Sequence, residues 1–263
     1  MRVRPPAVAG AFYPDDAVLL AGNVDGYLAD AERHPELAPR ALVAPHAGYL
    51  YSGPVAGSAF ATLRGAAGRF RRVVLLGPSH YVPFAGLALS SADAFATPLG
   101  RVPVDAGARE ALAGLSQVLL ADAPHEREHS LEVELPFLQR TLGEFRLVPL
   151  AVGEASDEQV AQVLARLTGE GDGETLIVVS TDLSHYHSYD TARRLDQRTS
   201  AAIEALRPEA IGDLDACGRV PLRGLLAWAR TRGLAATCLD LRNSGDTAGP
   251  HERVVGYGAY AFA

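Results

Sequence analysis

The sequence has few cysteines and no long apolar run, and both absences exclude whole classes of protein. Its 263 residues include two cysteines, Cys217 and Cys238, too few for the disulfide framework of a small secreted domain. No stretch approaches the roughly 18 consecutive apolar residues of a membrane-spanning helix, and residues 1–10 lack the apolar core of a signal peptide. We therefore expect a cytoplasmic protein with no membrane segment, in which both cysteines are thiols.

The sequence also lacks an excess of basic residues. Lysine and arginine total 24 against 31 aspartate and glutamate residues, which gives a net charge of −7 without long blocks of one sign. Nucleic-acid binding depends on clustered basic side chains that neutralise phosphates, so we expect no nucleic-acid partner. Apolar residues make up 48% of the chain, which is typical of a globular protein and argues against disorder.

The sequence does contain a regular alternation of short apolar runs and amphipathic stretches. The runs are nearly continuous in valine, leucine and isoleucine, as in strands that are buried on both faces. We expect strands at residues 41–44, 72–76, 86–90, 118–121, 146–152, 175–180, 236–241 and 254–262. Helical spacing occurs at residues 15–29, 54–64, 105–115, 130–142, 157–168, 189–206 and 220–232.

This alternation predicts a single α/β domain over residues 1–263, a three-layer sandwich with a mostly parallel mixed sheet between helices on both faces. No internal repeat or low-complexity linker interrupts it. The glycine-rich stretch 169–173 is better explained as a turn between a helix and a strand than as a linker. In open α/β sheets ligands bind beyond the carboxyl ends of strands, so polar residues in the loops that follow strands are candidates for function.

Two of these loops carry a histidine soon after a predicted strand. His46 is followed by Ala-Gly, which leaves room for a ligand, and Tyr49 is a candidate wall of the site. His80 follows the most strand-like run of the chain and precedes Tyr81. Two imidazoles at equivalent strand ends suit a metal site, although iron, copper, zinc and nickel all accept neutral imidazole. Each histidine alone is explained equally well by a hydrogen bond to a backbone carbonyl.

A third loop, Ser-Thr-Asp-Leu-Ser-His at 180–185, also follows an apolar strand. Asp182 and His185 are candidates for an acid/base pair, because a carboxylate near an imidazole fixes its tautomer and supports its protonated form. The alternative for Asp182 is a cap on a following helix. A polar loop that ends at Asp246 borders the same predicted edge, with simple turn formation as its alternative.

Two further segments carry reactive groups without following a predicted strand directly. His129 lies at a charged helix start, which is commonly solvent-exposed, but this helix is expected to follow a strand end, so His129 is a candidate to point into the same pocket. Cys217 lies beside Arg219 at another helix start, where a thiol pKa is lowered and a thiolate can ligate a metal or attack a substrate. The alternative for a lone cysteine is inert packing, and we expect this of Cys238, which lies inside an apolar strand.

Taken in order, these motifs resemble those of the Memo-like protein family, known in bacteria as AmmeMemoRadiSam system protein B. The motifs are Ala-Gly-Ala-Phe-Tyr at 9–13, Ala-Pro-His-Ala-Gly-Tyr at 44–49, Leu-Gly-Pro-Ser-His at 76–80, Glu-His-Ser-Leu-Glu at 128–132, Ser-Thr-Asp-Leu-Ser-His at 180–185 and Cys-Gly-Arg at 217–219. The resemblance covers nearly the whole chain. One position departs from relatives in higher organisms, because Glu134 stands where they have a histidine.

The resemblance implies a fold similar to that of the class III extradiol ring-cleaving dioxygenases, which hold non-haem Fe(II) with two histidines and a glutamate. It implies that His46, His80 and Cys217 bind the metal, with Asp182 and His185 as catalytic residues in the adjoining pocket. Fe(II) is the implied metal, with copper or zinc as alternatives. Because a cysteine stands where the dioxygenases use a carboxylate, ring cleavage does not follow from the fold.

Three classes of function remain open. The first is a metal-dependent oxidoreductase acting on a small aromatic or phenolic substrate, with Tyr49, Tyr81, His129 and Asp246 in the substrate site. The second is a non-enzymatic binding or regulatory module that uses the same cleft for a peptide or phosphorylated ligand. The third is a hydrolase that uses zinc-activated water or Cys217 as nucleophile. The bacterial family name also implies a radical-SAM protein of the same system as a partner.

Overall fold

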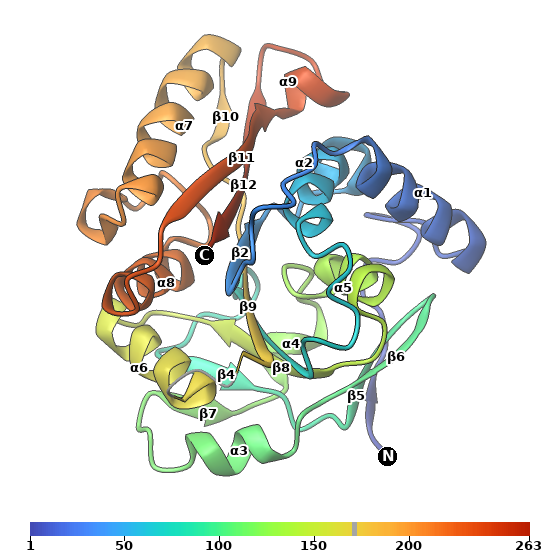
Figure 1. The fold of residues 1–263 in the computed structure, drawn as a ribbon, viewed down its shortest axis with the longest axis vertical. Coiled ribbons are helices and arrows are strands. Elements are labelled where there is room, and N and C mark those ends of the chain that lie inside the picture. Colours follow the sequence, from blue (N-terminus) through green and yellow to red (C-terminus); the bar gives the residue numbers. More distant parts are fainter. Residues whose placement is uncertain (170–172) are drawn as a thin grey trace.

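The computed structural model describes residues 1–169 and 173–263, which fold around a mixed β-sheet (Figure 1). The predicted turn at 169–173 falls mostly outside the described residues. Within them the large sheet has nine strands. They are β2 (Ala41–Ala44), β3 (Arg72–Pro78), β4 (Leu87–Leu89), β7 (Val118–Leu120), β8 (Arg146–Val152), β9 (Thr175–Ser180), β10 (His185–His187), β11 (Ala236–Asn243) and β12 (Val254–Phe262).

The centre of this sheet is parallel and its two sides are not. Strands β2, β9, β3 and β8 lie side by side in that order and run in the same direction. The prediction of a mostly parallel sheet holds for these four, but β12 pairs antiparallel with β2, and β4 pairs antiparallel with β8. Strands β10 and β11 also pair antiparallel with β12. β2 and β12, and likewise β4 and β8, are far apart in the chain, so the local alternation of strands and helices did not show that they pair antiparallel.

Helices cover both faces of the sheet, which confirms the predicted three layers (Figure 1). One face carries α1 (Ala17–Asp30), α2 (Tyr49–Ala61), the 3₁₀ turn η1 (Glu132–Glu134) and α5 (Leu135–Leu142). The other carries α3 (Gly107–Leu112), α6 (Asp157–Thr168), α7 (Tyr189–Glu204) and α8 (Arg219–Thr231). Short elements outside these layers are α4 (Ala123–Glu126), η2 (Pro208–Ala210), α9 (Ser244–Thr247) and a small sheet of β1 (Val3–Arg4), β5 (Ala94–Thr97) and β6 (Gly100–Pro103).

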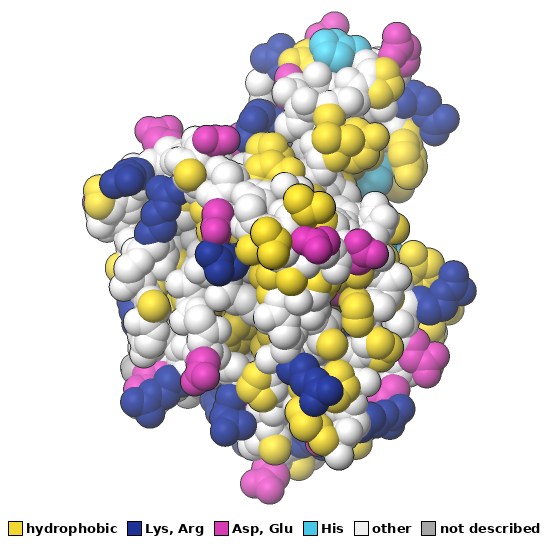
Figure 2. All heavy atoms as spheres, turned by 90° about the vertical axis from the view of Figure 1, so that its right-hand side faces the viewer, with side chains coloured by type: hydrophobic (Ala, Val, Ile, Leu, Met, Phe, Trp, Pro, Cys, Tyr) yellow, Lys and Arg dark blue, Asp and Glu magenta, His cyan; other side chains and the backbone are white. Residues whose placement is uncertain are grey.

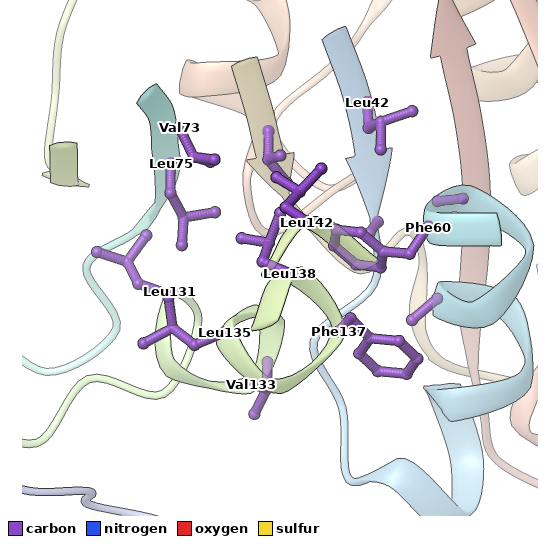
Figure 3. Packing of buried hydrophobic residues seen from close by; sticks show 14 of the residues in the cluster. Leu42, Phe60, Val73, Leu75, Leu131, Val133, Leu135, Phe137, Leu138 and Leu142 are labelled. Atoms are coloured by element: carbon purple, nitrogen blue, oxygen red, sulfur yellow. The ribbon is translucent and has the colours of Figure 1, made fainter. Parts of the chain in front are cut away.

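The two apolar cores are separated by the alternation of side chains along the strands. In β2, Leu42 packs toward α1, α2 and α5, whereas Val43 packs toward α6, α7 and α8. Figure 3 shows the first core, where the rings of Phe60 and Phe137 stack with their centroids 5.2 Å apart. Burial on both faces explains why these strands are continuous apolar runs in the sequence.

Helix α2 differs from its prediction in a way that affects the site. The helical spacing predicted a helix over residues 54–64. The helix instead begins at Tyr49, three residues after His46, and contains Pro54 in its interior. By contrast, α6 begins where predicted because Ser156 and Gln159 form a capping box at its first turn.

The surface carries charges of both signs. On the face shown in Figure 2, basic and acidic side chains are interspersed around scattered apolar ones. Among the described helices, none combines the length and apolar character needed to cross a membrane.

Candidate metal centre

The central parallel strands bring the three histidine-bearing loops together. β9 lies between β2 and β3, and the three strands are parallel. The loops that carry His46, Asp182 and His80 therefore follow the carboxyl ends of neighbouring strands and lie side by side. Together with neighbouring segments they form a cleft of about 640 Å³. Its lining residues are Phe12, His46, Ala47, Gly48, His80, Tyr81, His129, Asp182, His185, Tyr186, Asp213, Leu214, Ala216, Cys217 and Val255.

His46, His80 and Cys217 form a group that could hold a metal ion. Each offers one ligand atom, and these atoms all lie within 4.8 Å of one another. Sγ of Cys217 lies 3.3 Å from Nε2 of His46. Cys217 reaches this position from the segment before α8, where a Cβ on Gly218 would lie only 2.7 Å from the Cβ of Thr181. Glycine at position 218 therefore lets the cysteine segment approach the end of β9.

A chain of hydrogen bonds orients His46. Its Nδ1 lies 2.8 Å from Oγ of Ser180, and this hydroxyl donates to Oε1 of Glu134 at 2.8 Å. Since the single hydroxyl hydrogen of Ser180 goes to Glu134, Nδ1 of His46 must carry the proton and donate to Ser180. Nε2 of His46 is then left with a lone pair directed at Cys217. Burial holds the pKa of His46 well below its usual range, so the ring is neutral, as a metal ligand must be.

Glu128 orients His80 in the same way. Its carboxylate accepts hydrogen bonds from Nδ1 and the backbone N–H of His80, at 2.8 and 2.6 Å, and from the backbone N–H groups of His129 and Ser130. Burial alone would raise the pKa of Glu128, but the hydrogen bonds that it accepts, first among them the one from the His80 ring, lower it to about 2. The ionised carboxylate fixes His80 through Nδ1 and leaves Nε2 available. Acceptors of this kind behind metal-binding histidines are a general feature of metal sites.

The thiol of Cys217 differs from its prediction. A helix start beside Arg219 suggested a lowered pKa, but burial and the nearby Asp182 carboxylate raise the pKa of Cys217 to about 12. Arg219 does not compensate, because its guanidinium pairs with Asp213 at 3.0 Å. A thiol in this setting becomes a thiolate when a bound cation supplies the stabilising charge. The donor set of two imidazoles and one buried thiol therefore fits a metal ion.

Asp182 and His185 both line the cleft but do not form the predicted acid/base pair. Nδ1 of His185 donates to the carbonyl of Leu183 at 2.7 Å, which fixes its tautomer and leaves a lone pair on Nε2. Oδ1 of Asp182 instead accepts from the backbone N–H of His46 at 2.8 Å, and burial raises the pKa of Asp182 to about 7. The alternative of a helix cap also fails, because the segment continues into strand β10.

His129 and Tyr81 lie in the cleft, as the sequence suggested. The ring of His129 stacks on that of His80, with centroids 4.6 Å apart, and meets the ring of His46 edge-on at 5.4 Å. The ring of His129 also packs against that of Phe12, with the ring centroids 4.8 Å apart. With Glu128 and His80 it makes a second group whose ligand atoms lie within 4.8 Å of one another. Tyr81 stands at the mouth with 48% of its surface exposed.

Two predicted substrate residues lie outside the cleft. Tyr49 is the first residue of α2, so its side chain is buried in the core, where its hydroxyl donates to the carbonyl of Val133 at 2.6 Å. Asp246 accepts hydrogen bonds from the hydroxyl of Tyr189 and from the backbone N–H of Asn243, and with Asn243 it forms the capping box of the single-turn helix α9. The turn alternative therefore explains Asp246.

The sequence did not single out Phe12, Ser180 or Tyr186 as members of the site. Phe12 and Ser180 lie inside recognised motifs, but nothing in their spacing showed which way they face. Tyr186 has φ of 62°, a conformation that costs a non-glycine residue about 1 kcal/mol, and it falls at an irregularity in the pairing of β10 with β12. Backbone strain of this kind leaves no signal in a single sequence.

Comparison with known proteins identifies relatives that match almost the whole chain. The family model described as Memo-like protein matches residues 4–261. A MEMO1 family protein of Aquifex aeolicus is 37% identical over 98% of this chain and 98% of its own length. A MEMO1 family protein of Aeropyrum pernix is 36% identical over 98% of this chain and 99% of its own length.

A solved structure shares the fold alone. The crystal structure of uncharacterized protein JW3007 from Escherichia coli K12 has a TM-score of 0.57 and 13% sequence identity, and the match covers 86% of this chain and 100% of that one. The family model and the relatives at more than 30% identity both span almost the entire chain. The protein therefore belongs to the Memo-like family.

Proposed function

We propose that the protein is a metal-dependent oxidoreductase in which His46, His80 and Cys217 hold one Fe(II), with copper as the alternative metal. The observation that carries this proposal is the convergence of their three ligand atoms within 4.8 Å at an open cleft. Ser180 forms a hydrogen bond with Nδ1 of His46, and Glu128 forms one with Nδ1 of His80. Nε2 of each ring is therefore left to bind the metal. Three protein ligands beside a cleft favour a site with free coordination positions over a closed structural one.

The cleft suits a small aromatic or phenolic substrate. Phe12, Tyr81 and Val255 supply apolar and aromatic surface, while the imidazoles below supply polar contacts. When bound, Fe(II) with free positions supplies one-electron chemistry with dioxygen. The protein's own contribution is to bind and orient the substrate and to exchange its protons.

His185 is the proposed proton acceptor for a phenolic hydroxyl. Its Nδ1 is held by the Leu183 carbonyl, so the basic Nε2 is fixed in direction, and the ring lines the cleft. Burial lowers the pKa of His185, which keeps it in the neutral form that accepts a proton. Asp182, with a pKa of about 7, holds the backbone of His46 in place and lines the same cleft, where it is the second group proposed to exchange protons.

A second candidate is a thiol hydrolase, favoured by the 3.3 Å contact between Sγ of Cys217 and Nε2 of His46. Such a pair activates a cysteine when the histidine takes the thiol proton. The elevated pKa of Cys217 disfavours this use, because little thiolate is present without a cation. A non-enzymatic binding module and a radical-SAM partner are also consistent with the cleft, but no contact in it favours them.

Iron loading tests the proposal. Protein purified without oxygen is incubated with Fe(II), desalted and analysed for iron, and nitric oxide is then added for electron paramagnetic resonance. We expect about one iron per chain and a ferrous nitrosyl signal in the wild type, and loss of both in Cys217→Ala. Cys238→Ala is the matched control, because Cys238 lies on β11 outside the cleft.

Equal iron in the wild type and Cys217→Ala, or iron in neither, would contradict the ligand assignment. Oxygen uptake with a panel of catechols then separates an enzyme from a binding module. Rapid alkylation of Cys217 by iodoacetamide at neutral pH in metal-free protein would instead support the hydrolase.

A further inference from the structure

Two arginines without an acidic partner among the described residues stack on tyrosines that line the cleft. The guanidinium carbon of Arg127 lies 5.1 Å from the ring centroid of Tyr81, and that of Arg253 lies 5.1 Å from the ring centroid of Tyr186. Within residues 1–169 and 173–263, neither arginine makes an ion pair or a side-chain hydrogen bond. Both tyrosines line the cleft, so each stacked arginine is attached to the wall of the site.

The other arginine near the cleft is already compensated. Arg219 pairs with Asp213 at 3.0 Å and with Glu154 at 3.5 Å. Arg127 and Arg253 therefore keep uncompensated positive charges beside two residues of the cleft wall, in a protein whose net charge is −7. A positive region at the entrance of a site raises the local concentration of anions.

The backbone holds one of these tyrosines in place at a cost. Tyr186 has φ of 62°, and its side chain is 63% exposed. Its neighbours are fixed by the pairing of β10 with β12 and by the bond from His185 to the carbonyl of Leu183. An exposed aromatic ring gains nothing for the core from this conformation. Strained residues of this kind cluster at ligand-binding sites, where the surrounding structure maintains them.

We infer that Arg127 and Arg253 select a substrate that carries a carboxylate, so that the cleft takes a small aromatic acid rather than a neutral phenol. That the substrate is aromatic rests on the proposed function, whereas the requirement for a negative charge on the substrate rests on the two arginines. A guanidinium stacked on a tyrosine keeps its N–H edge free in a fixed plane, and this edge matches the two oxygens of a carboxylate. The substrate ring then lies against Tyr81 or Tyr186, with its acid group at the mouth.

Binding to metal-free protein tests this inference independently of the metal. Ligand-observed NMR titrations at low ionic strength compare 3,4-dihydroxybenzoate with 3,4-dihydroxybenzamide, which have nearly the same shape and differ in charge. We expect the wild type to bind the acid about fivefold more tightly than the amide, as for an exposed ion pair. The double variant Arg127→Gln/Arg253→Gln loses this preference and keeps its affinity for the amide.

Two further variants separate charge from structure. Arg127→Lys/Arg253→Lys keeps the charge and retains most of the preference. Arg69→Gln is the matched control, because Arg69 also stacks on an aromatic ring, that of Phe70, but lies before β3 at the opposite end of the strand from His80. Its preference equals that of the wild type.

The outcomes distinguish this inference from the proposed function. A charge preference that Arg127→Gln/Arg253→Gln abolishes supports the inference, even if the protein takes up no iron. Equal affinity for acid and amide, no measurable binding of the acid, or a preference that survives in the double variant overturns it, even if iron loads as proposed.

Discussion

Two buried glutamates lie two residues apart on the turn η1 and have opposite surroundings. Glu132 accepts hydrogen bonds from the backbone N–H groups of Ala7 and Val8 and from the hydroxyl of Tyr13, and it pairs with Arg4. Glu134 is equally buried but has one donor, Ser180. Its second oxygen has no partner among the described residues.

The difference separates a structural acid from one that serves the site. Both oxygens of Glu132 are satisfied by the N-terminal segment, so its role is to anchor that segment. Burial raises the pKa of Glu134 well above its usual range, and its single hydrogen bond leads through Ser180 to His46. Natural proteins leave few buried polar groups unsatisfied, and such groups call for an explanation. We propose that Glu134 is kept in this state because it supports His46, one of the proposed metal ligands.

Removal of Glu132 should have the largest effect, on stability. Glu132→Ala leaves Arg4 buried without its counter-charge and frees three other donors, so we expect a loss of about 3–5 kcal/mol in denaturant unfolding. The double variant Arg4→Met/Glu132→Leu removes both charges and should lose less than Glu132→Ala. A loss below about 1 kcal/mol for Glu132→Ala would remove the contrast between the two acids.

Acid should weaken the same anchored region through His125. Arg4 donates to the carbonyl of His125, whose ring is buried beside the carbonyl of Ala88, and burial lowers the pKa of His125 to about 4. The unfolded chain binds a proton near pH 6.5 and the folded one only near pH 4, so stability falls as pH decreases across this window and the slope ends below it. The total loss in the free energy of unfolding from this group is about 3 kcal/mol. Unfolding of His125→Gln between pH 7 and 4 should show a flatter dependence than the wild type, and equal slopes would exclude this group.

Glu134→Gln should affect the metal rather than the fold. Glutamine keeps an acceptor for Ser180 but cannot ionise when a cation binds to His46. We expect iron affinity, measured by competition with a chelator, to fall about 10- to 100-fold, as for other residues that support metal ligands. Unfolding of the metal-free protein should change by less than about 1 kcal/mol. A large loss of stability with unchanged iron affinity would place Glu134 in the same class as Glu132.

The smallest effect is expected at Tyr186. Asparagine tolerates positive φ better than tyrosine, so Tyr186→Asn should raise the free energy of unfolding by at most about 1 kcal/mol. Binding of an aromatic ligand should weaken at the same time. Thermal unfolding together with ligand titration measures both, and a destabilised variant would show that the ring supports the fold rather than the site.

The sequence was sufficient to predict the frame of the site. Continuous apolar runs located β2, β8, β9 and β12 at their observed bounds, because strands buried on both faces have no polar interruptions. The parallel arrangement of β2, β9 and β3 then explains why their loops meet. The small sheet of β1, β5 and β6 was missed, since its strands are short and lack such runs.

The supporting contacts could not be predicted in the same way. The link from His46 through Ser180 to Glu134 joins three segments, and only the packing of η1 against the sheet brings them together. Tyr49 was assigned to the site because it follows His46, but the start of α2 at that residue turns its ring into the core. The placement of Cys217 was implied by the family resemblance and not by its position after a helix-forming stretch.

X-ray absorption at the iron edge tests the central claim most directly. In iron-loaded wild type we predict one sulfur neighbour at about 2.3 Å together with imidazole nitrogens, and loss of the sulfur shell in Cys217→Ser. Cys238→Ser should leave the spectrum unchanged. An iron site without sulfur in the wild type would contradict the assignment and would move the metal to the group of His80, Glu128 and His129.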